Sequence, residues 1–514
     1  MDFSTSNLFV LKDNPFLTLC VILVLTILYR TINQRKLPPG PRPLPLIGNL
    51  HQLGDNLPDT LLAWHRQYGP IISYKLGQQR AISISSHKIS VDLLSKRSAI
   101  YSSRPDFVNA RHSTHGLNMA LMPYTKQWET HRRLITPLVN TQKSNEYRVL
   151  QDVESKQLLS DLMTNNDFSY HFMRYTASLG YTLQYGKRLE GEENNFEIME
   201  TSAIVKELVE ALTQIGFGIV ELFPVLDCLP SFLAPWKKFG EKSYTRAATF
   251  YQANLQKGQS SSNWNWTQQI SQLPVAQRVS STDLSFLLGL TLQAGVETTV
   301  SALRVFIKAS LLHPECVKKA QKELDEVVGP DRLPSFEDSS RLPYIHAMVE
   351  EVLRWQQVGP IGIPHATTAD DEYMGYHIPK NTAVIPNNWA IAFDETTYPD
   401  PYAFKPERWF DESTPSMSGF GYGRRICPGK QIALNTMYIN AARILWGYNI
   451  HHVYRGGKKV EVGAWDIDHG FVSGPKKFEV DFQVRSERHR EVIEKEWMSV
   501  EKDTDVLLQG LRGR

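Results

Sequence analysis

The sequence predicts a mainly helical fold with small β-sheets, of the α+β class, because many stretches have helical spacing and few alternate as strands do. Helical stretches recur along the body, at residues 65–69, 124–139, 196–215 and 283–312. Strand signals are restricted to Ile71–Leu76, Ala81–Ile84 and a C-terminal pair around 458–462 and 478–482. Of the 514 residues, 42% are hydrophobic and 21% are charged, so the chain can bury a large core and is not mainly disordered.

Charge and cysteine content exclude several classes of protein. Lys and Arg number 56 against 54 Asp and Glu, and this balance argues against a nucleic-acid binder that relies on a basic surface. The widely spaced cysteines form no C-x-x-C pair, which excludes a zinc knuckle, a thioredoxin-type redox pair and a disulfide scaffold. These cysteines are Cys20, Cys228, Cys316 and Cys427.

The amino terminus predicts a retained membrane anchor. Phe16–Tyr29 is an apolar run that is short for a full span, and snorkelling or local thinning of the bilayer can absorb the difference. Arg30, Arg35 and Lys36 follow the run, whereas a cleaved signal peptide carries its positive charge before it. By the positive-inside rule, residues 1–36 are predicted to form a single-pass anchor, with the body of the protein in the cytosol. The alternative is a buried core helix, against which the terminal position before a Pro-rich break argues.

Three further segments follow the anchor. Residues 37–46 (LPPGPRPLPL) contain five prolines, which forbid a helix and predict a stiff hinge between the anchor and the globular body. Residues 47–485 form the body. Residues 486–514 are rich in charge and are predicted to be a solvated helix or a frayed end.

Cys427 lies in a segment, FGYGRRICPGK, that predicts a special environment for its sulfur. Glycines allow tight turns beside something flat or bulky, and the neighbouring arginines and backbone N–H groups predict a lowered thiol pKa. The residues that follow have helical spacing, so Cys427 is expected at a loop-to-helix junction near a positive helix end. A lone thiolate there can be a nucleophile, a redox sensor or a metal ligand. A phosphate loop ending at Lys430 is excluded, because Arg424 stands where that motif needs glycine.

The same segment resembles the F-x-x-G-x-R-x-C-x-G signature of the cytochrome P450 haem-thiolate monooxygenases, at Phe420, Gly423, Arg425, Cys427 and Gly429. The resemblance is to the microsomal class, with similarity to fungal members of secondary metabolism. It implies the cytochrome P450 fold over residues 47–485, with a long central distal helix over haem b. Cys427 would then be the axial thiolate ligand of the haem iron, which favours O–O bond cleavage.

The family also carries an E-x-x-R pair on a helix, and Glu351 and Arg354 match it. The spacing puts both side chains on one helix face, where they can pair. Two other pairs have the same spacing, Glu129 with Arg132 and Glu487 with Arg490, and a surface pair of this kind contributes little. Only Glu351 lies upstream of Cys427 at a family-like distance, and Arg408 would complete the structural triad.

The family's distal-helix motif is matched by Ala294, Gly295, Glu297 and Thr298. Thr282 or Asp283 is expected to cap this helix, and His313 is expected to end it. A mid-helix threonine can also bond to a backbone carbonyl and simply bend the helix. The resemblance implies instead a groove for dioxygen, in which Thr298 helps to deliver protons and Glu297 supplies them.

Four residues would bind the haem propionates by the same resemblance. Trp128 and Arg132 match the family's W-x-x-x-R helix, and Arg425 and His365 would be further partners. Arginine suits this role, because its planar fork binds a carboxylate through two hydrogen bonds.

The resemblance implies a monooxygenase that inserts one oxygen atom of dioxygen into a hydrophobic small molecule. Electrons would come from NADPH through a separate cytochrome P450 reductase, and the enzyme would lie in the endoplasmic reticulum membrane with a cytosolic catalytic domain. The expected substrate-facing segments are mainly apolar. They are residues 112–122, 208–223, 293–298, 358–363 and 470–472.

Two alternatives stay open beside the monooxygenase. One is a haem-thiolate isomerase or dehydratase, although such enzymes often lack the threonine found here as Thr298. The other is a non-catalytic haem-binding or ligand-binding membrane protein. A cationic docking face for an acidic reductase could be formed by Lys126, Arg133, Arg424 and Lys430, or these residues could be an ordinary solvated surface.

Overall fold

The computed structural model describes residues 36–54, 56–191, 195–213, 215–416 and 419–512, without the side chains of residues 195 and 211–217. Apart from Lys36, the predicted anchor at 1–36 lies outside the described residues.

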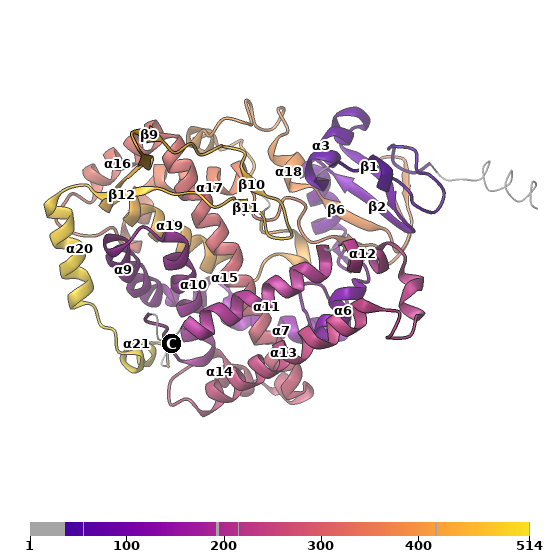
Figure 1. Cartoon of the computed structure of the whole chain (residues 1–514), viewed down its shortest axis with the longest axis horizontal. Helices are drawn as coiled ribbons and strands as arrows, with labels where there is room; N and C mark the ends of the chain where they lie inside the picture. Colours follow the sequence, from indigo (N-terminus) through magenta and orange to yellow (C-terminus); the bar gives the residue numbers. More distant parts are fainter. Residues whose placement is uncertain (1–35, 55, 192–194, 214, 417–418, 513–514) are drawn as a thin grey trace, which may run out of the picture.

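Helices dominate the described chain, as the sequence predicts, and Figure 1 shows them filling most of the molecule. The α-helices are α3 (Leu57–Tyr68), α4 (His87–Ser90), α5 (Ser98–Tyr101), α6 (Val108–Thr114), α7 (Lys126–Val139), α8 (Thr141–Glu146), α9 (Arg148–Thr164), α10 (Phe168–Tyr185), α11 (Asn195–Thr213), α12 (Ile215–Leu222), α13 (Pro235–Ser260), α14 (Trp266–Ser271), α15 (Ser281–Leu312), α16 (Pro314–Val327), α17 (Pro343–Trp355), α18 (Asn388–Ala392), α19 (Lys430–Gly447), α20 (Glu487–Ser499) and α21 (Thr504–Arg512).

The largest sheet lies at one end of the molecule, beside α3 and α18 (Figure 1). Its strand order is β1–β2–β6–β3, where β2 pairs antiparallel with β1 and parallel with β6, and β6 pairs antiparallel with β3. Its apolar strands build two small clusters that are separate from the main helical core. The strands are β1 (Ile71–Leu76), β2 (Gln79–Ile84), β6 (Ala383–Pro386) and β3 (His365–Ala366).

The remaining strands form two-stranded pairs. The two C-terminal strand signals, around 458–462 and 478–482, each coincide with a short strand, and each strand pairs with a segment that was not predicted. The pairs are β4 (Asp371–Tyr373) with β5 (Tyr376–Ile378), β7 (Tyr448–His451) with β12 (Asp481–Val484), β8 (Tyr454–Arg455) with β9 (Lys458–Lys459), and β10 (Ile467–Asp468) with β11 (Gly474–Pro475).

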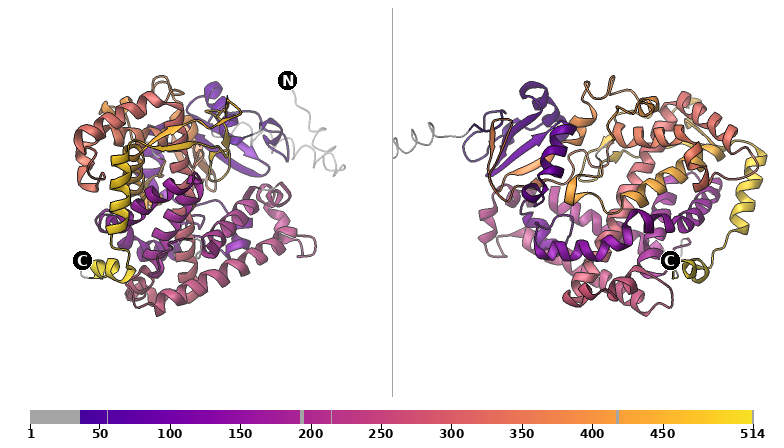
Figure 2. Two further views of the ribbon diagram at one scale, coloured as in Figure 1. Left: turned by 60° about the vertical axis from the view of Figure 1, so that its left-hand side comes forward. Right: turned by 180° about the vertical axis from the view of Figure 1, so that it is seen from behind.

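Helix α15 is the long central helix that the sequence predicts, and its 32 residues run through the middle of the molecule (Figures 1 and 2). Ser280 caps it by accepting a hydrogen bond from the Asp283 N–H, so the cap lies just before the two residues expected to supply it. Among the described residues, α15 alone is long and apolar enough to cross a membrane, but 67% of its most apolar stretch is buried inside the protein. It is therefore a core helix.

The two flanking segments pack against the body. In the proline-rich segment, the carbonyls of Pro38 and Pro39 accept hydrogen bonds from the side chain and the backbone of Ser73 on β1. After residue 485 the chain forms α20 and α21, each with one buried face. His489 contacts Trp446 of α19, with ring centroids 4.5 Å apart, so the charged tail is neither frayed nor fully solvated. Figure 2 shows the tail along the edge opposite the large sheet.

Candidate functional site

Cys427 lies in the loop that leads into α19, at the junction predicted from the sequence. The Cys427 N–H donates to the Phe420 carbonyl at 2.8 Å, which closes the loop into a compact turn. Gly423 has φ +52° and approaches the Leu94 carbonyl so closely that a Cβ there would clash. The same loop holds Gly429, whose Cα faces open space. The turn therefore presents the sulfur beside the first turn of α19.

The predicted lowering of the Cys427 pKa is wrong for the protein alone. Burial raises the pKa of this thiol, and the Gly429 N–H and the charges of Arg132 and Lys430 offset that effect only in part. The apolar enclosure outweighs the cations that the sequence revealed. A metal cation bound to the sulfur would reverse this balance, because a coordinating thiol is deprotonated.

Helix α7 brings Trp128 and Arg132 to the same place, one turn apart. The Arg425 guanidinium lies 4.2 Å from the centroid of the Trp128 ring, a cation–π contact between α7 and the Cys427 loop. Arg425 is fixed further by donating to the carbonyls of Ser102, Met119 and Met122 at 2.7, 3.2 and 2.7 Å. For the side chain of Arg132, no hydrogen bond or ion pair is recorded within the described part of the chain.

Arg104 is a member of this group that the sequence analysis missed. It is buried and donates to the carbonyls of Ala120, Ile363 and Pro364 at 2.9, 2.6 and 2.9 Å. Two of these partners lie 259 and 260 residues away in the chain, so no local pattern marks Arg104. We call Arg104, Arg132 and Arg425 the cationic cluster.

The cationic cluster has no acidic partner among the residues that the structure describes. Burial lowers the pKa of all three guanidinium groups. The charge of Arg425 lowers the pKa of Arg104 further, and the charge of Arg132 helps to lower that of Arg425 to about 9. Buried cations without anions are costly, so the arrangement fits a ligand that brings negative charge. The two propionates of haem supply such charge, and the residues present therefore fit this cofactor.

His365 lies on β3, and its ring is held in a neutral form that does not suit a cationic partner of a propionate. Its Nδ1 is 2.7 Å from the Tyr101 carbonyl, which assigns the proton of the neutral ring to Nδ1. Burial and the charge of Arg104 lower the pKa of His365 well below its usual value, and Arg425 adds to this effect. The neutral ring can only accept at Nε2, so it would need a second proton to donate to a carboxylate.

The distal-helix motif lies on the surface of α15 that faces away from the packed core. Ala294 and Gly295 are exposed, and a Cβ on Gly295 would meet nothing within 4 Å. The Thr298 hydroxyl donates to the Ala294 carbonyl at 2.7 Å, the bond that either a bent helix or a polar groove requires. Glu297 accepts a hydrogen bond from Ser202 of α11 at 2.6 Å, and sequence analysis did not identify Ser202.

The structure brings Glu351, Arg354 and Arg408 together in a fully connected ion-pair network. Arg354 donates to both Glu351 carboxylate oxygens at 2.7 and 2.9 Å, and Arg408 Nε lies 3.1 Å from the same carboxylate. The Trp409 indole N–H and the Lys405 N–H complete the shell at 3.0 and 2.8 Å. By contrast, Glu487 and Arg490 form a surface pair at 3.5 Å, and no ion pair is recorded between Glu129 and Arg132 in the described chain.

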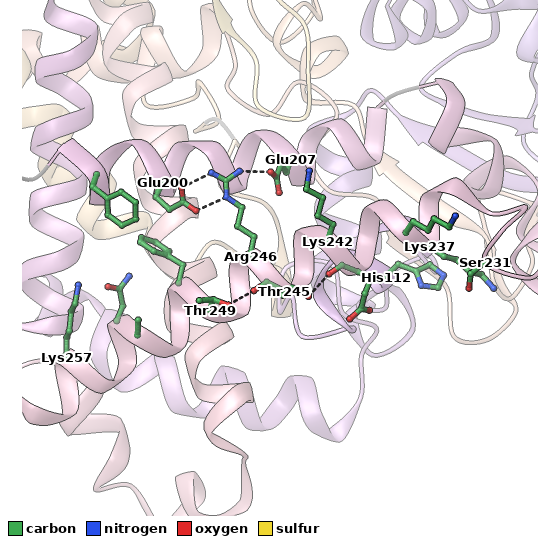
Figure 3. Close-up of a pocket in the computed structure, with 16 residues that line it drawn as sticks. His112, Glu200, Glu207, Ser231, Lys237, Lys242, Thr245, Arg246, Thr249 and Lys257 are labelled. Atoms are coloured by element: carbon green, nitrogen blue, oxygen red, sulfur yellow. Dashed lines mark hydrogen bonds and ion pairs between the residues drawn. The ribbon is translucent and has the colours of Figure 1, made fainter.

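Two of the expected substrate-facing segments are joined through Arg104, which donates to the carbonyls of Ala120 and Ile363. Two further contacts involve residues outside the expected ranges. The Ser473 N–H donates to the Val358 carbonyl, and the Gln293 side chain contacts the Thr201 carbonyl at 3.5 Å. A separate groove of about 1290 Å³ lies between α11 and α13, lined mainly by charged residues. Figure 3 shows Arg246 bridging Glu200 and Glu207 across this groove, so the charges of these three residues are paired.

Comparison with known proteins identifies the family. The cytochrome P450 family model matches residues 38–482. The chain is 39% identical to the cytochrome P450 monooxygenase FrzL of a Cladobotryum species, over 96% of each protein. It is 41% identical to the cytochrome P450 monooxygenase aneD of Aspergillus aculeatus, over 93% of this chain and 94% of the relative.

A solved structure shows the same fold. It is a zebrafish cytochrome P450 determined with abiraterone, with a TM-score of 0.68 and 23% sequence identity, and the match covers 84% of this chain and all of that one. The fold, the family model and the relatives all agree with the resemblance carried by the Cys427 segment. The chain belongs to the cytochrome P450 family and is a monooxygenase, an oxidoreductase that incorporates oxygen from dioxygen.

Proposed function

We propose that the protein binds haem b through Cys427 and the cationic cluster, and oxidises a hydrophobic small molecule. The observation that carries this proposal is the cationic cluster itself, three guanidinium groups beside the cysteine loop with no acidic partner among the described residues. Arg104 is buried, and Arg132 and Arg425 are half-buried. When bound, the haem supplies the redox chemistry that activates dioxygen. Trp128 and Arg425 order one side of the site by stacking.

In this proposal, α15 supplies the groups that handle protons. Thr298 lies one turn after Ala294 and Gly295, which are exposed, and Glu297 directly precedes it in the chain. The single hydroxyl proton of Thr298 bonds to the Ala294 carbonyl or, after rotation about χ1, to a group outside the helix, and the Glu297 carboxylate can exchange protons with solvent. This role for Thr298 favours oxygenation over the isomerase and dehydratase alternatives.

The lining of the site supports a hydrophobic substrate. The expected substrate-facing segments are mainly apolar, which suits an apolar ligand. The relatives reported above are fungal monooxygenases. We therefore infer a role in fungal secondary metabolism.

NADPH–cytochrome P450 reductase is the proposed electron donor, docking on the face formed by α7 and the Cys427 loop. Lys126, Arg133 and Arg424 are exposed there, and Arg424 is held by Tyr124 at 2.6 Å. With Lys430, these side chains make no recorded ion pair within the described residues, which leaves their charges available to an acidic partner.

A membrane location is proposed from one apolar surface beside residue 36. Two groups of exposed apolar residues, at 44–47 and 219–233, lie on either side of the β1–β2 turn. The Gly77 N–H donates to the Ile47 carbonyl, and the Gln78 N–H donates to the Leu222 carbonyl. With the apolar run at 16–29, this surface would hold the domain against the endoplasmic reticulum membrane. Its exposed members are Leu44, Leu46, Ile47, Ile219, Val225, Phe232 and Leu233.

The absorption spectrum of the dithionite-reduced protein, with and without carbon monoxide, tests the haem-thiolate proposal. We expect a strongly red-shifted Soret band with carbon monoxide, and we expect Cys427→Ala to abolish it. A haem spectrum without that shift contradicts Cys427 as the ligand. Folded protein that takes up no haem contradicts the whole proposal.

Reductase docking has its own test. Arg133→Glu and Lys126→Glu should lower the rate of reduction by NADPH and reductase several-fold, and the loss should shrink as salt is raised. Lys322→Glu is the matched control, because Lys322 is exposed on α16 and its one ion-pair partner in the described structure is Glu326 of the same helix. Equal rates for all three variants would contradict this docking face.

A further inference from the structure

Helix α11 contacts the distal-helix motif directly at one charged side chain. The Ser202 hydroxyl of α11 donates to Glu297 Oε1 of α15 at 2.6 Å. The same hydroxyl also lies 3.6 Å from Met173 Sδ, but it has a single proton, and the carboxylate is the stronger and nearer acceptor. Ser202 is thus bonded to the acid of the motif.

Within the described part of the chain, the Glu297 carboxylate has no other hydrogen bond. No lysine, arginine or histidine lies within ion-pair distance of its carboxylate in that part of the chain either. The charge of Glu297 acts at longer range on Arg304 of the same helix, whose pKa it raises slightly against the effect of burial. Glu297 therefore has one tether, and that tether comes from a different helix.

The opposite face of α11 is held by a separate set of contacts. Glu200 and Glu207 bind Arg246 of α13 at 2.7 and 2.5 Å, on the groove side shown in Figure 3. Residues two positions apart on a helix point to nearly opposite faces, so Ser202 faces α15 while Glu200 faces α13. The contacts of the two faces can be removed independently.

We propose that Ser202 is a positioning residue whose hydrogen bond holds the Glu297 carboxylate in place beside Thr298 for proton delivery. This inference rests on the proposed function. A carboxylate with one tether has several rotamers available once the tether is lost. The position of Glu297 therefore depends on the Ser202 hydroxyl and not on the contacts of the opposite face of α11.

The consequence concerns how dioxygen is reduced. With electrons from NADPH through the reductase and protons from solvent, two electrons and two protons convert dioxygen to hydrogen peroxide. Four electrons and four protons convert it to two molecules of water. Poor proton delivery favours the early release of peroxide. Disorder at Glu297 should therefore raise the share of NADPH electrons recovered as peroxide, even without an added organic substrate.

The first experiment measures the contact itself. Thermal unfolding of the haem-loaded full chain is compared for Ser202→Ala, Glu297→Ala and the double variant. We expect the second substitution to lower the unfolding temperature much less when the first is already present, because both remove the same hydrogen bond. Additive losses would overturn the contact and with it the inference.

The second experiment measures peroxide formed per NADPH consumed with the reductase. We expect Ser202→Ala to raise this ratio roughly two- to fivefold, toward the value of Glu297→Ala, as loss of part of a general acid–base contribution predicts. Ser202→Thr keeps the hydroxyl and should restore the ratio. Arg246→Gln loosens α11 on its other face and should leave the ratio unchanged, because it does not touch Glu297.

The outcomes separate the inference from the proposed function. An unchanged ratio in Ser202→Ala, with a raised ratio in Glu297→Ala, overturns the positioning role of Ser202 and leaves Glu297 as a proton donor. An unchanged ratio in both variants removes Glu297 from the mechanism. A raised ratio in Arg246→Gln attributes the effect to a loose α11 and also overturns the inference.

Discussion

Two buried arginine clusters in this protein differ in whether their charge is paired. Arg354 and Arg408 share the Glu351 carboxylate, with side-chain exposures of 0%, 7% and 0%. Arg104 is equally buried in the cationic cluster, but it donates only to backbone carbonyls. One cluster contains its own counter-charge, whereas the other has no acidic partner among the described residues, which is why we propose that it binds the haem propionates.

The difference follows from the cost of buried charge. A buried ion pair is roughly balanced, because mutual attraction and hydrogen bonds offset the loss of hydration. The carbonyls around Arg104 and Arg425 supply hydrogen bonds but no net negative charge. The paired cluster can therefore stabilise the fold from the moment the chain folds, while the cationic cluster gains its full stability only with ligand.

Removing the anion of the paired cluster should have the largest effect. Glu351→Gln leaves Arg354 and Arg408 buried without a counter-charge, so we expect a loss of about 3–5 kcal/mol in the free energy of unfolding. Thermal or denaturant unfolding of the haem-loaded protein, together with soluble yield, measures this loss.

Glu487→Gln is the matched control, since Glu487 and Arg490 have the same spacing on an exposed helix. That variant should change stability by less than about 0.5 kcal/mol. A similar loss in both variants would mean that burial does not distinguish the two pairs.

Removing a cation from the cationic cluster should have a smaller effect, and it should lower the affinity for haem and not the stability of the fold. Arg132 has no recorded bond to the described protein, so Arg132→Gln should leave the apo-protein as stable as before or slightly more stable. Loss of a charged hydrogen-bond partner for a propionate, worth about 1.5–3 kcal/mol, should weaken haem binding roughly 10- to 100-fold. Haem transfer to a scavenger protein measures this affinity, and Arg133→Gln is the exposed neighbouring control.

Arg104→Gln tests whether Arg104 and Arg132 differ in their contribution to the apo-fold. Arg104 also joins the carbonyls of Ala120, Ile363 and Pro364, so its loss should weaken both haem binding and the apo-fold. Equal apo-stability losses for Arg104→Gln and Arg132→Gln would contradict the view that Arg132 is reserved for the ligand.

The fold and the Cys427 loop could be predicted because the sequence patterns that mark them are local. The spacing around Cys427 and the pattern from Ala294 to Thr298 lie within single short segments, and each marks its helix as well as its chemistry. The helix α15 was predicted to within a few residues of both ends. The strand partners of 458–462 and 478–482 were not predicted. Strand β8 has only two residues, too few to show alternation, and β12 pairs with β7 about 30 residues earlier in the chain.

The missed site residues share a dependence on distant contacts. Arg104 acts through carbonyls up to 260 residues away, and Ser202 reaches Glu297 across 95 residues. Both belong to common residue types without a motif of their own. The pKa of Cys427 was predicted in the wrong direction for a related reason, since the sequence shows nearby cations but not the apolar enclosure.

The smallest of the expected effects is on the pH dependence of stability, where the charge of the cationic cluster acts on His365. Burial and Arg104 hold the pKa of His365 well below its usual value, so the folded protein keeps this ring neutral. The unfolded chain takes up a proton near pH 6.5 that the folded chain refuses. Stability from this group is therefore present above about pH 6.5 and is lost as the pH falls, with a limiting slope of about 1.4 kcal/mol per pH unit.

His365→Asn, which can still donate to the Tyr101 carbonyl, should remove this part of the acid slope. Denaturant unfolding of the apo-protein and of the haem-loaded protein, between about pH 5 and pH 7, measures the slope. Bound propionates would offset the arginine charges and let His365 take up its proton more easily, so the slope should be shallower with haem than without it. An acid slope that is the same in both forms would mean that no anion lies close to the cationic cluster when haem is bound.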